Sequence, residues 1–166
     1  MTNVHPLSRT PALIDNCDQW RDALQQYLDA HIPLCQAMAV RVQHLSHHEL
    51  ALSAPLAPNI NDKGTAFGGA IASLLTICGW GVVWSLCQHH QIDLDIVIRQ
   101  SQLRYLQPAK GELLVRCALP DAATWQAFCA RLESRGKARI SLEPALESEN
   151  QLASAMVAEY AGLVKA

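Results

Sequence analysis

Two adjacent glycines and an asparagine mark the stretch of the chain best suited to chemistry. Residues 59–70 read NINDKGTAFGGA, so a polar loop containing Asn61 leads through Gly68 and Gly69 into a long apolar segment. The first N–H groups of a helix have no partner within the helix, and glycines leave them unshielded at the positive end of the helix dipole. Such groups can stabilise negative charge on a carbonyl oxygen. Alternatively, the glycines only allow a neighbouring strand to approach closely.

Two hydroxyl groups follow on the helical face that begins at Gly69. Gly69, Ser73, Thr76 and Trp80 recur at spacings that place them on one stripe of a helix. Ser73 and Thr76 can therefore face one cavity, where a hydroxyl donates a hydrogen bond or positions a water but stays protonated at neutral pH. In the alternative, each hydroxyl bonds back to a carbonyl of the same helix.

The polar residues outside this stretch of the helix could also take part in chemistry, but each has a more common structural role. Asp62 is the carboxylate nearest to the glycines, but a solvated turn is the commoner place for such a residue. Ser101 and Arg99 share one face of an expected strand and could reach the site, with a surface ladder as the alternative. We expect no metal site, because the histidine pairs lack the spacing of metal ligands; they are His47-His48 and His89-His90.

A cluster of positive charge lies late in the chain. It could contact phosphates or the acidic helix of a partner protein, or it could form a solvated edge. Its members are Arg131, Arg135, Lys137 and Arg139.

The element that positions the glycines is a charge-free run over residues 66–87. It is long enough to span a membrane. It also contains four glycines and several hydroxyl residues, and the only basic flank close by is Lys63. A helix buried on all sides by its own protein gives the same signal, so we expect no membrane insertion.

Hydropathy patterns predict the remaining elements. A helix begins at Asp18, which can cap it, and stops at Pro33; a strand pair follows within residues 34–56, interrupted near 46–48. A strand over residues 92–106, buried on both faces, turns through 108–111 into a partner strand over 112–119. A helix capped by Asp121 or Thr124 ends at Gly136, and two strands over 137–146 and 151–163 complete the chain, with the turn at Glu149-Asn150.

This order predicts an α+β fold in which a single antiparallel sheet curls around one central helix, with an additional N-terminal helix and a short helix before the last two strands. A helix on an open two-layer sheet is the alternative. At 166 residues the chain fits one domain, which we expect over residues 18–166 after a flexible lead-in over 1–17.

Composition narrows the class of protein. The formal net charge of −2 argues against a general binder of nucleic acid. The six cysteines are scattered without a C-x-x-C pair, which is typical of reduced core residues. Because the N-terminal residues also lack a secretory pattern, we expect a cytoplasmic protein.

The motif NINDKGTAFGGAIASLL, followed by GW and by a strand ending RYLQPAKGELLV, resembles the hotdog-fold acyl-thioester enzymes, closest to their YiiD C-terminal, thioesterase-like branch. The resemblance covers roughly residues 18–163. It implies a homodimer, or a dimer of dimers, with active sites at the subunit interface. It also implies substrates carried by coenzyme A or acyl carrier protein, whose phosphopantetheine belongs to the substrate, so that no separate cofactor is expected.

The resemblance also assigns residues. It implies that the Gly68 N–H polarises the thioester carbonyl and that Asn61 orients the carbonyl or the water. Thr76 stands where hydrolytic relatives have a carboxylate, and Phe67 stands where many relatives have His before the glycines. We take Asn61, Gly68 and Thr76 as catalytic candidates; the candidates for substrate binding are Phe67, Gly69, Ser73 and Ser101.

Three functions remain open. Hydrolysis of an acyl thioester is the leading one, although Thr76 is a poor replacement for a carboxylate base. Decarboxylation of a malonyl thioester, in support of fatty-acid initiation, needs no base to activate water and is the second. A binding protein without catalytic activity is the third.

Overall fold

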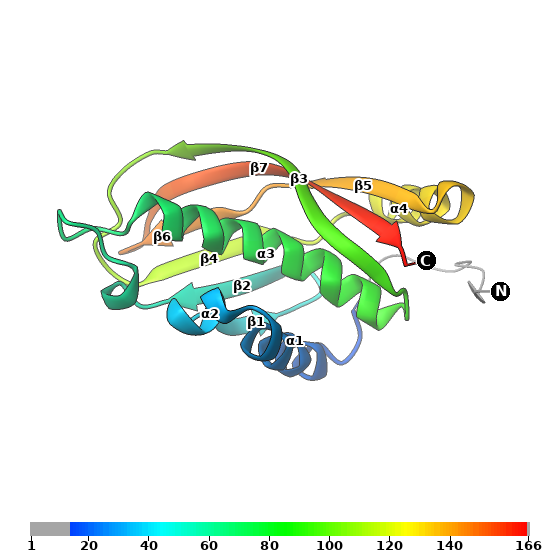
Figure 1. The fold of residues 1–166 in the computed structure, drawn as a ribbon, viewed down its shortest axis with the longest axis horizontal. Coiled ribbons are helices and arrows are strands. Elements are labelled where there is room, and N and C mark those ends of the chain that lie inside the picture. The colour runs from blue at the N-terminus through cyan, green and yellow to red at the C-terminus, as the bar shows by residue number, and fades with distance from the viewer. Residues whose placement is uncertain (1–13, 166) are drawn as a thin grey trace.

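The computed structural model describes residues 14–165 and shows an antiparallel sheet curled around a central helix, α3 (Gly68–His89) (Figure 1). Its strands are β1 (Arg41–Leu45), β2 (Glu49–Ala54), β3 (Leu94–Tyr105), β4 (Leu113–Ala118), β5 (Lys137–Leu142), β6 (Ala145–Ser148) and β7 (Gln151–Val164). They follow the order β1-β2-β4-β6-β7-β3, and β5 also pairs with β7. Helix α3 contacts strands from β2 to β3, so the expected architecture is confirmed. The expected lead-in lies mostly outside the described residues.

Helix α3 is a core helix, with 78% of its most apolar window buried. Two glycines let the sheet and the first helix approach it closely. Gly79 lies directly beneath the hydroxyl of Tyr160, and Gly81 lies against Leu50 and Leu24. The run of apolar residues that is long enough to cross a membrane is therefore explained by burial within the protein.

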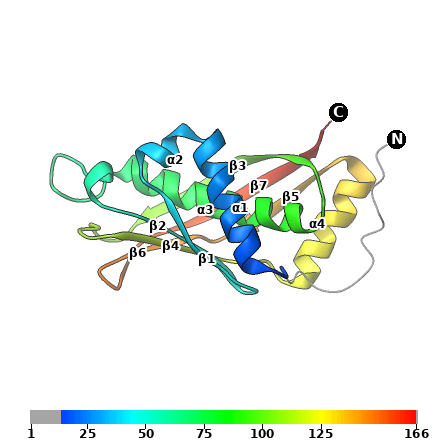
Figure 2. The ribbon, with the colours of Figure 1, turned by 90° about the horizontal axis from the view of Figure 1, so that it is seen from below.

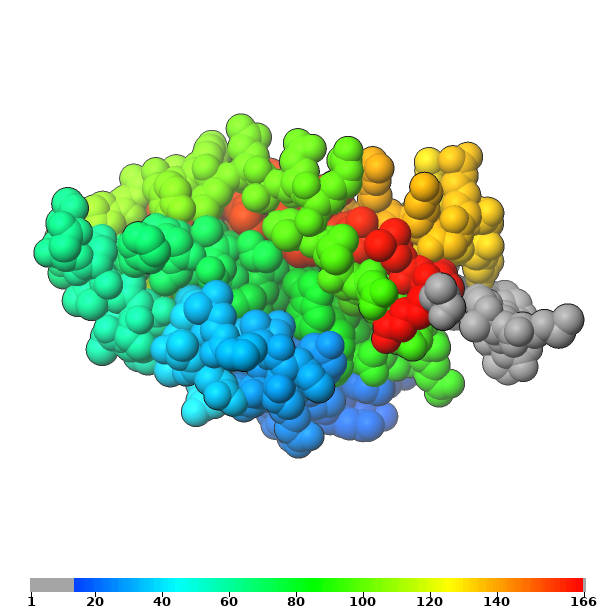
Figure 3. All heavy atoms as spheres, in the orientation of Figure 1, coloured from blue at the N-terminus to red at the C-terminus, as the bar shows by residue number. Residues whose placement is uncertain are grey.

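One face of α3 is not covered, so the expectation of burial on all sides is wrong. A stripe that starts at the exposed Gly69 continues through the half-buried Ser73, Thr76 and Trp80. Figure 3 shows atoms of α3 at the surface, between the blue N-terminal helices and the light green strand β3. The small residues Gly69, Ser73 and Thr76 of this stripe leave an open surface beside β3, whereas Trp80 donates a hydrogen bond to the Ile96 carbonyl of β3.

The N-terminal helices lie on the same side of the sheet as α3 (Figure 2). Helix α1 (Cys17–His31) has the expected extent, but it begins after Asn16, and Asp18 forms an ion pair with Arg21 instead of capping it. A second short helix, α2 (Pro33–Ala37), replaces the start of the extended run predicted from residue 34. The strand pair β1–β2 matches the prediction, with its break at residues 46–48.

The predicted pairing of the long strand with the strand after it is wrong. Within residues 14–165, strand β3 pairs only with β7, whereas β4 pairs with β2 and β6. Residues 106–112 are thus a crossing between distant strands and not a hairpin turn, because the hydropathy of a strand does not reveal its partner.

Strand β3 is an edge strand, so the expectation that both its faces are buried is also wrong. None of the eleven residues of β3 after Leu94 is buried, and Val97 and Ile98 are 47% and 38% exposed. A bulge at Arg99 shifts the register, so that Ile98 pairs with Tyr160 and Ser101 with Ala158. Tyr160 and Ala158 are both fully buried, which places Ser101 on the face of the sheet that carries α3.

The C-terminal region follows the expected pattern with one extra strand. The Asp121 carboxylate accepts a hydrogen bond from Thr124 N and caps α4 (Ala122–Arg135), which Gly136 ends at φ 65°. The run predicted as one strand over residues 137–146 is split into β5 and β6 around Pro144, so three strands follow α4. The turn at Glu149-Asn150 has two positive φ angles, as a tight hairpin requires.

Candidate active site

The loop before α3 is held by the side chain of Asn61. Its Nδ2 donates to Thr65 Oγ1 at 2.9 Å and to the Ala66 carbonyl at 3.3 Å, and its Oδ1 accepts from the N–H of Lys63 at 2.8 Å and of Thr65 at 3.1 Å. Both amide hydrogens of Asn61 are therefore used within the loop. The geometry gives Asn61 the role of shaping the entrance to the helix, and its predicted contact with substrate would require these bonds to rearrange.

The helix entrance leaves backbone donors free. Phe67 is the N-cap, and its side chain cannot bond to the first turn. The first hydrogen bond that anchors the turn runs from Ile71 N to the Phe67 carbonyl at 3.0 Å. Within residues 14–165, the N–H groups of Gly68, Gly69 and Ala70 have no hydrogen-bond acceptor. They form the cluster of donors that the sequence predicts, and they point out of the positive end of a 22-residue helix.

Two aromatic rings flank the glycine pair. The Phe67 ring lies where a Cβ on Gly69 would be, and the Tyr105 hydroxyl lies 3.3 Å from where a Cβ on Gly68 would be. Both side chains are more than half exposed, at 58% and 56%. Tyr105 also donates a hydrogen bond to the Gly68 carbonyl at 2.9 Å. Sequence reasoning missed Tyr105, since its position at the end of β3 depends on the register of that strand.

The two hydroxyls of the helical stripe differ. Ser73 Oγ donates to the Gly69 carbonyl at 2.9 Å, which is the back-bonded alternative. The backbone carbonyl of Thr76 accepts a hydrogen bond from Tyr160 Oη at 3.0 Å. The side-chain hydroxyl of Thr76 has no hydrogen-bond partner among the described residues. Thr76 is half-buried on the open stripe, so its hydroxyl is accessible to a ligand or a water.

The bulge in β3 separates Ser101 from Arg99. Ser101 is exposed on the same sheet face as Tyr105, whose neighbour in β7 is the buried Ser154. Arg99 instead forms an ion pair with Glu159 at 2.6 Å. The structure therefore keeps Ser101 on the side of α3 and assigns Arg99 to a surface ladder.

Among the described residues, no carboxylate or imidazole forms a hydrogen bond with the first turn of α3, where Tyr105 and Ser73 are the side-chain donors. Asp62 is exposed and pairs with Lys63 at 3.0 Å in the loop. His89 lies at the other end of α3, about 30 Å away at 1.5 Å per residue. Residues 14–165 contain no group of three or more histidine, cysteine, aspartate or glutamate side chains arranged to hold a metal ion.

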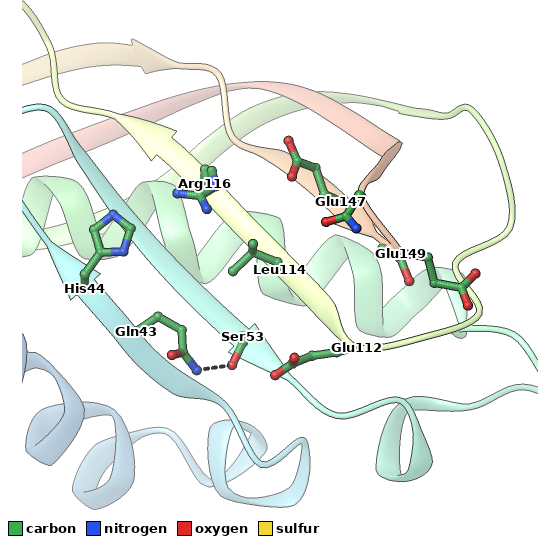
Figure 4. Close-up of a pocket in the computed structure, with 10 residues that line it drawn as sticks. Gln43, His44, Ser53, Glu112, Leu114, Arg116, Glu147 and Glu149 are labelled. Carbon is green, nitrogen blue, oxygen red and sulfur yellow. Dashed lines mark hydrogen bonds between the residues drawn. The ribbon is translucent and has the colours of Figure 1, made fainter.

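A polar hollow of about 530 Å³ lies elsewhere, over β1, β2, β4 and β6. Figure 4 shows its acidic rim, formed by Glu112, Glu147 and Glu149, with α3 behind the sheet. Its two basic residues, His44 and Arg116, both bond to Glu49, at 2.9 and 2.5 Å. Burial opposes ionisation of Glu49, but these two bonds outweigh it and lower the pKa of Glu49. The two basic residues of the hollow thus connect β1 and β4 to Glu49 of β2, which lies between them.

The late cluster of positive charge is divided between two elements. Arg131 and Arg135 are exposed on α4, whereas Lys137 and Arg139 are exposed on β5. Arg139 lies 3.9 Å from Glu159.

Comparisons with known proteins agree with this fold. A family model described as "Putative thioesterase (yiiD_Cterm)" matches residues 21–164. The crystal structure of a protein of unknown function from Chlorobaculum tepidum TLS is 31% identical, with a TM-score of 0.86 over 93% of this chain and 98% of that one. A "putative thioesterase" from Shewanella oneidensis is 32% identical, with a TM-score of 0.76 over 88% and 98%. A "Probable Thioesterase" from Pseudomonas aeruginosa, 24% identical with a TM-score of 0.73 over 87% and 95%, shares the fold.

Proposed function

Because the chain belongs to the YiiD C-terminal thioesterase family and has its hotdog fold, we propose that it hydrolyses acyl thioesters carried by coenzyme A or by acyl carrier protein. The observation that carries the proposal is the set of free N–H groups at Gly68 and Gly69, which point out of the end of α3 where its partly exposed stripe begins. In hydrolysis, water adds to the carbonyl carbon, the carbonyl oxygen gains negative charge, and the C–S bond then breaks to release an acid and a thiol. Donors aimed at that oxygen stabilise the charge where it develops.

A second copy of the chain would complete the site. Gly68 and Thr76 are eight residues apart, or about 12 Å along a helix axis, so one carbonyl group cannot contact both within one chain. The uncovered stripe of α3 and the unpaired edge of β3 both favour association with a second copy. We therefore propose a homodimer in which Gly68 of one subunit and Thr76 of the partner subunit face one thioester. Sedimentation should then give twice the 18.2 kDa mass of the chain.

Mixing two variants tests this arrangement. Gly69→Ala alters the helix entrance, and Thr76→Val removes the hydroxyl. In a mixed dimer of the two, one site carries both changes and the other carries neither. Random exchange of subunits should thus restore about a quarter of the wild-type sites, because a two-fold dimer holds two equivalent sites. Mixtures that stay as inactive as the separate variants would show that each site lies within one chain.

Decarboxylation of a malonyl thioester is the second candidate, favoured by the free hydroxyl of Thr76 at the position of the expected carboxylate. In this reaction the C–C bond to the malonyl carboxylate breaks and carbon dioxide leaves. The electron pair of the broken C–C bond moves onto the thioester oxygen. A proton from water then adds to the carbon that carried the carboxylate, which gives an acetyl thioester. Hydrogen-bond donors such as Thr76 can stabilise that oxygen without activating a water.

Product analysis separates these functions. Hydrolysis predicts free thiol from a panel of acyl-CoA and acyl-carrier substrates, and Asn61→Ala should suppress it by loosening the loop that Asn61 holds. Decarboxylation predicts acetyl thioester and carbon dioxide without free thiol. Saturable binding with neither product would favour a binding protein. We also propose a cytoplasmic location, for which the six free cysteines are the support.

A further inference from the structure

The side chain of Tyr105 links the edge strand to the first turn of the central helix. It is the last residue of β3, and its hydroxyl donates to the Gly68 carbonyl at 2.9 Å. Water could satisfy this hydroxyl, since the side chain is 56% exposed. The bond to the helix is therefore not forced by burial, and it selects one carbonyl in the turn that carries the free donors.

That carbonyl is part of the peptide unit that carries the Gly69 N–H. A peptide unit is planar, so a bond that fixes the Gly68 carbonyl also fixes the direction of the Gly69 N–H. The helix constrains this peptide through its i→i+4 bonding, and Tyr105 adds a second bond from outside the helix, at a pair of glycines whose backbone is intrinsically permissive. A hydrogen bond to the carbonyl also polarises the amide and strengthens the N–H as a donor, by about 10–30%.

We propose that Tyr105 is a positioning residue that orients and polarises the Gly68–Gly69 peptide, so that the Gly69 N–H donates to the thioester oxygen beside the Gly68 N–H. The inference rests on the proposed function and deepens that function, because it identifies the Gly69 N–H as the second donor to the thioester oxygen and Tyr105 as the residue that orients this donor. The Phe67 ring lies against Gly69 and the Tyr105 ring lies against Gly68, so both rings border the two donors.

Tyr105→Phe removes the hydroxyl and keeps the ring. Losing a bond worth about 1 kcal/mol in the transition state should lower kcat about fivefold to tenfold, with KM changed less than about twofold. The pH profile should keep its shape, because Tyr105 does not transfer a proton in this account.

Tyr160→Phe is the matched control. Tyr160 also donates its hydroxyl to a carbonyl of α3, that of Thr76 at 3.0 Å, but it is fully buried. This control should lower the melting temperature while leaving kcat within about twofold, since the loss of a buried hydrogen bond acts on stability. A Tyr105→Phe variant with unchanged kcat, or with only a raised KM, would overturn the inference.

A measurement without substrate keeps the inference separate from the proposed function. In the NMR spectrum of the free protein, Tyr105→Phe should move the amide proton of Gly69 upfield, while the amide of Gly81 stays in place. An unmoved Gly69 amide overturns the inference even if the protein is a thioesterase. If the wild type turns over no thioester, the proposed function fails, and the Gly69 shift still decides whether Tyr105 polarises this peptide.

Discussion

Replacing each of two glycines of α3 with alanine should separate function from stability. The change is the same methyl group on the same helix, at Gly69 and at Gly79. At Gly69 the new Cβ overlaps the ring of Phe67, which is 58% exposed and can move into solvent. At Gly79 it overlaps the hydroxyl of Tyr160, which is fully buried.

The magnitudes follow from these surroundings. Alanine gains up to about 1 kcal/mol over glycine in a helix, so Gly69→Ala should keep or raise the melting temperature by up to about 2–4 °C. Overpacking costs about 1–3 kcal/mol and the helix propensity of alanine offsets about 1 kcal/mol of it, so Gly79→Ala should lose up to about 2 kcal/mol net, or up to about 8 °C. Complete loss of one oxyanion donor lowers kcat about 100-fold or more. The methyl group of Gly69→Ala crowds the donor without removing it, so this variant should lower kcat about 10- to 100-fold.

Calorimetry and thiol release measure the two effects. The folded fraction of Gly79→Ala should keep its kcat within about twofold, because this glycine lies nearly three turns beyond Gly69. Full activity in Gly69→Ala, or a loss of stability as large as that of Gly79→Ala, would refute the assignment of the free N–H groups to catalysis.

Three further outcomes follow from the structure. Thr76→Val should lower kcat at least about tenfold without shifting the melting temperature by more than about 2 °C, since valine keeps the shape and loses only the free hydroxyl; an unchanged kcat contradicts a role for that hydroxyl. Burial, and then the neighbouring His89, lower the pKa of His90 below its usual value of 6.5. The unfolded chain therefore binds the proton more readily than the folded protein, so the melting temperature should fall as the pH drops below 6.5. His90→Phe, which keeps a ring against Trp125, should flatten this fall between pH 7 and 5, and a slope equal to that of the wild type would show that other groups cause it. Burial raises the pKa of four thiols to about 11 or 12, so a thiol reagent at pH 8 should titrate at most Cys17 in the folded protein, whereas rapid reaction of several thiols would contradict their burial.

The entrance to the helix could be predicted because its signals are local. A charge-free run with glycines at its start predicts where α3 begins, and the structure begins it at Gly68. The cap at Asp121 and the turn at Glu149-Asn150 are local in the same sense and were predicted correctly. The stripe from Gly69 to Thr76 also follows from helical spacing alone.

The partners of the strands could not be predicted, because they depend on contacts between distant residues. The turn residues 108–111 suggested a hairpin, yet β3 pairs with β7, nearly fifty residues further on. The bulge at Arg99 moves the residues after it to the opposite face of the sheet from the one that strict alternation predicts. Alternation in the sequence therefore assigned these residues to the wrong face. Tyr105 reaches the Gly68 carbonyl only as a result of both features, which explains why the sequence did not reveal it.

The most direct test of the account is mass spectrometry of the products formed from medium-chain acyl-CoA and from malonyl-CoA, with the Gly69→Ala variant alongside. The account predicts free carboxylic acid and free coenzyme A from the acyl-CoA, formed at least about tenfold more slowly by the variant. Intact substrates after prolonged incubation with wild-type protein, or equal rates for wild type and variant, would contradict it.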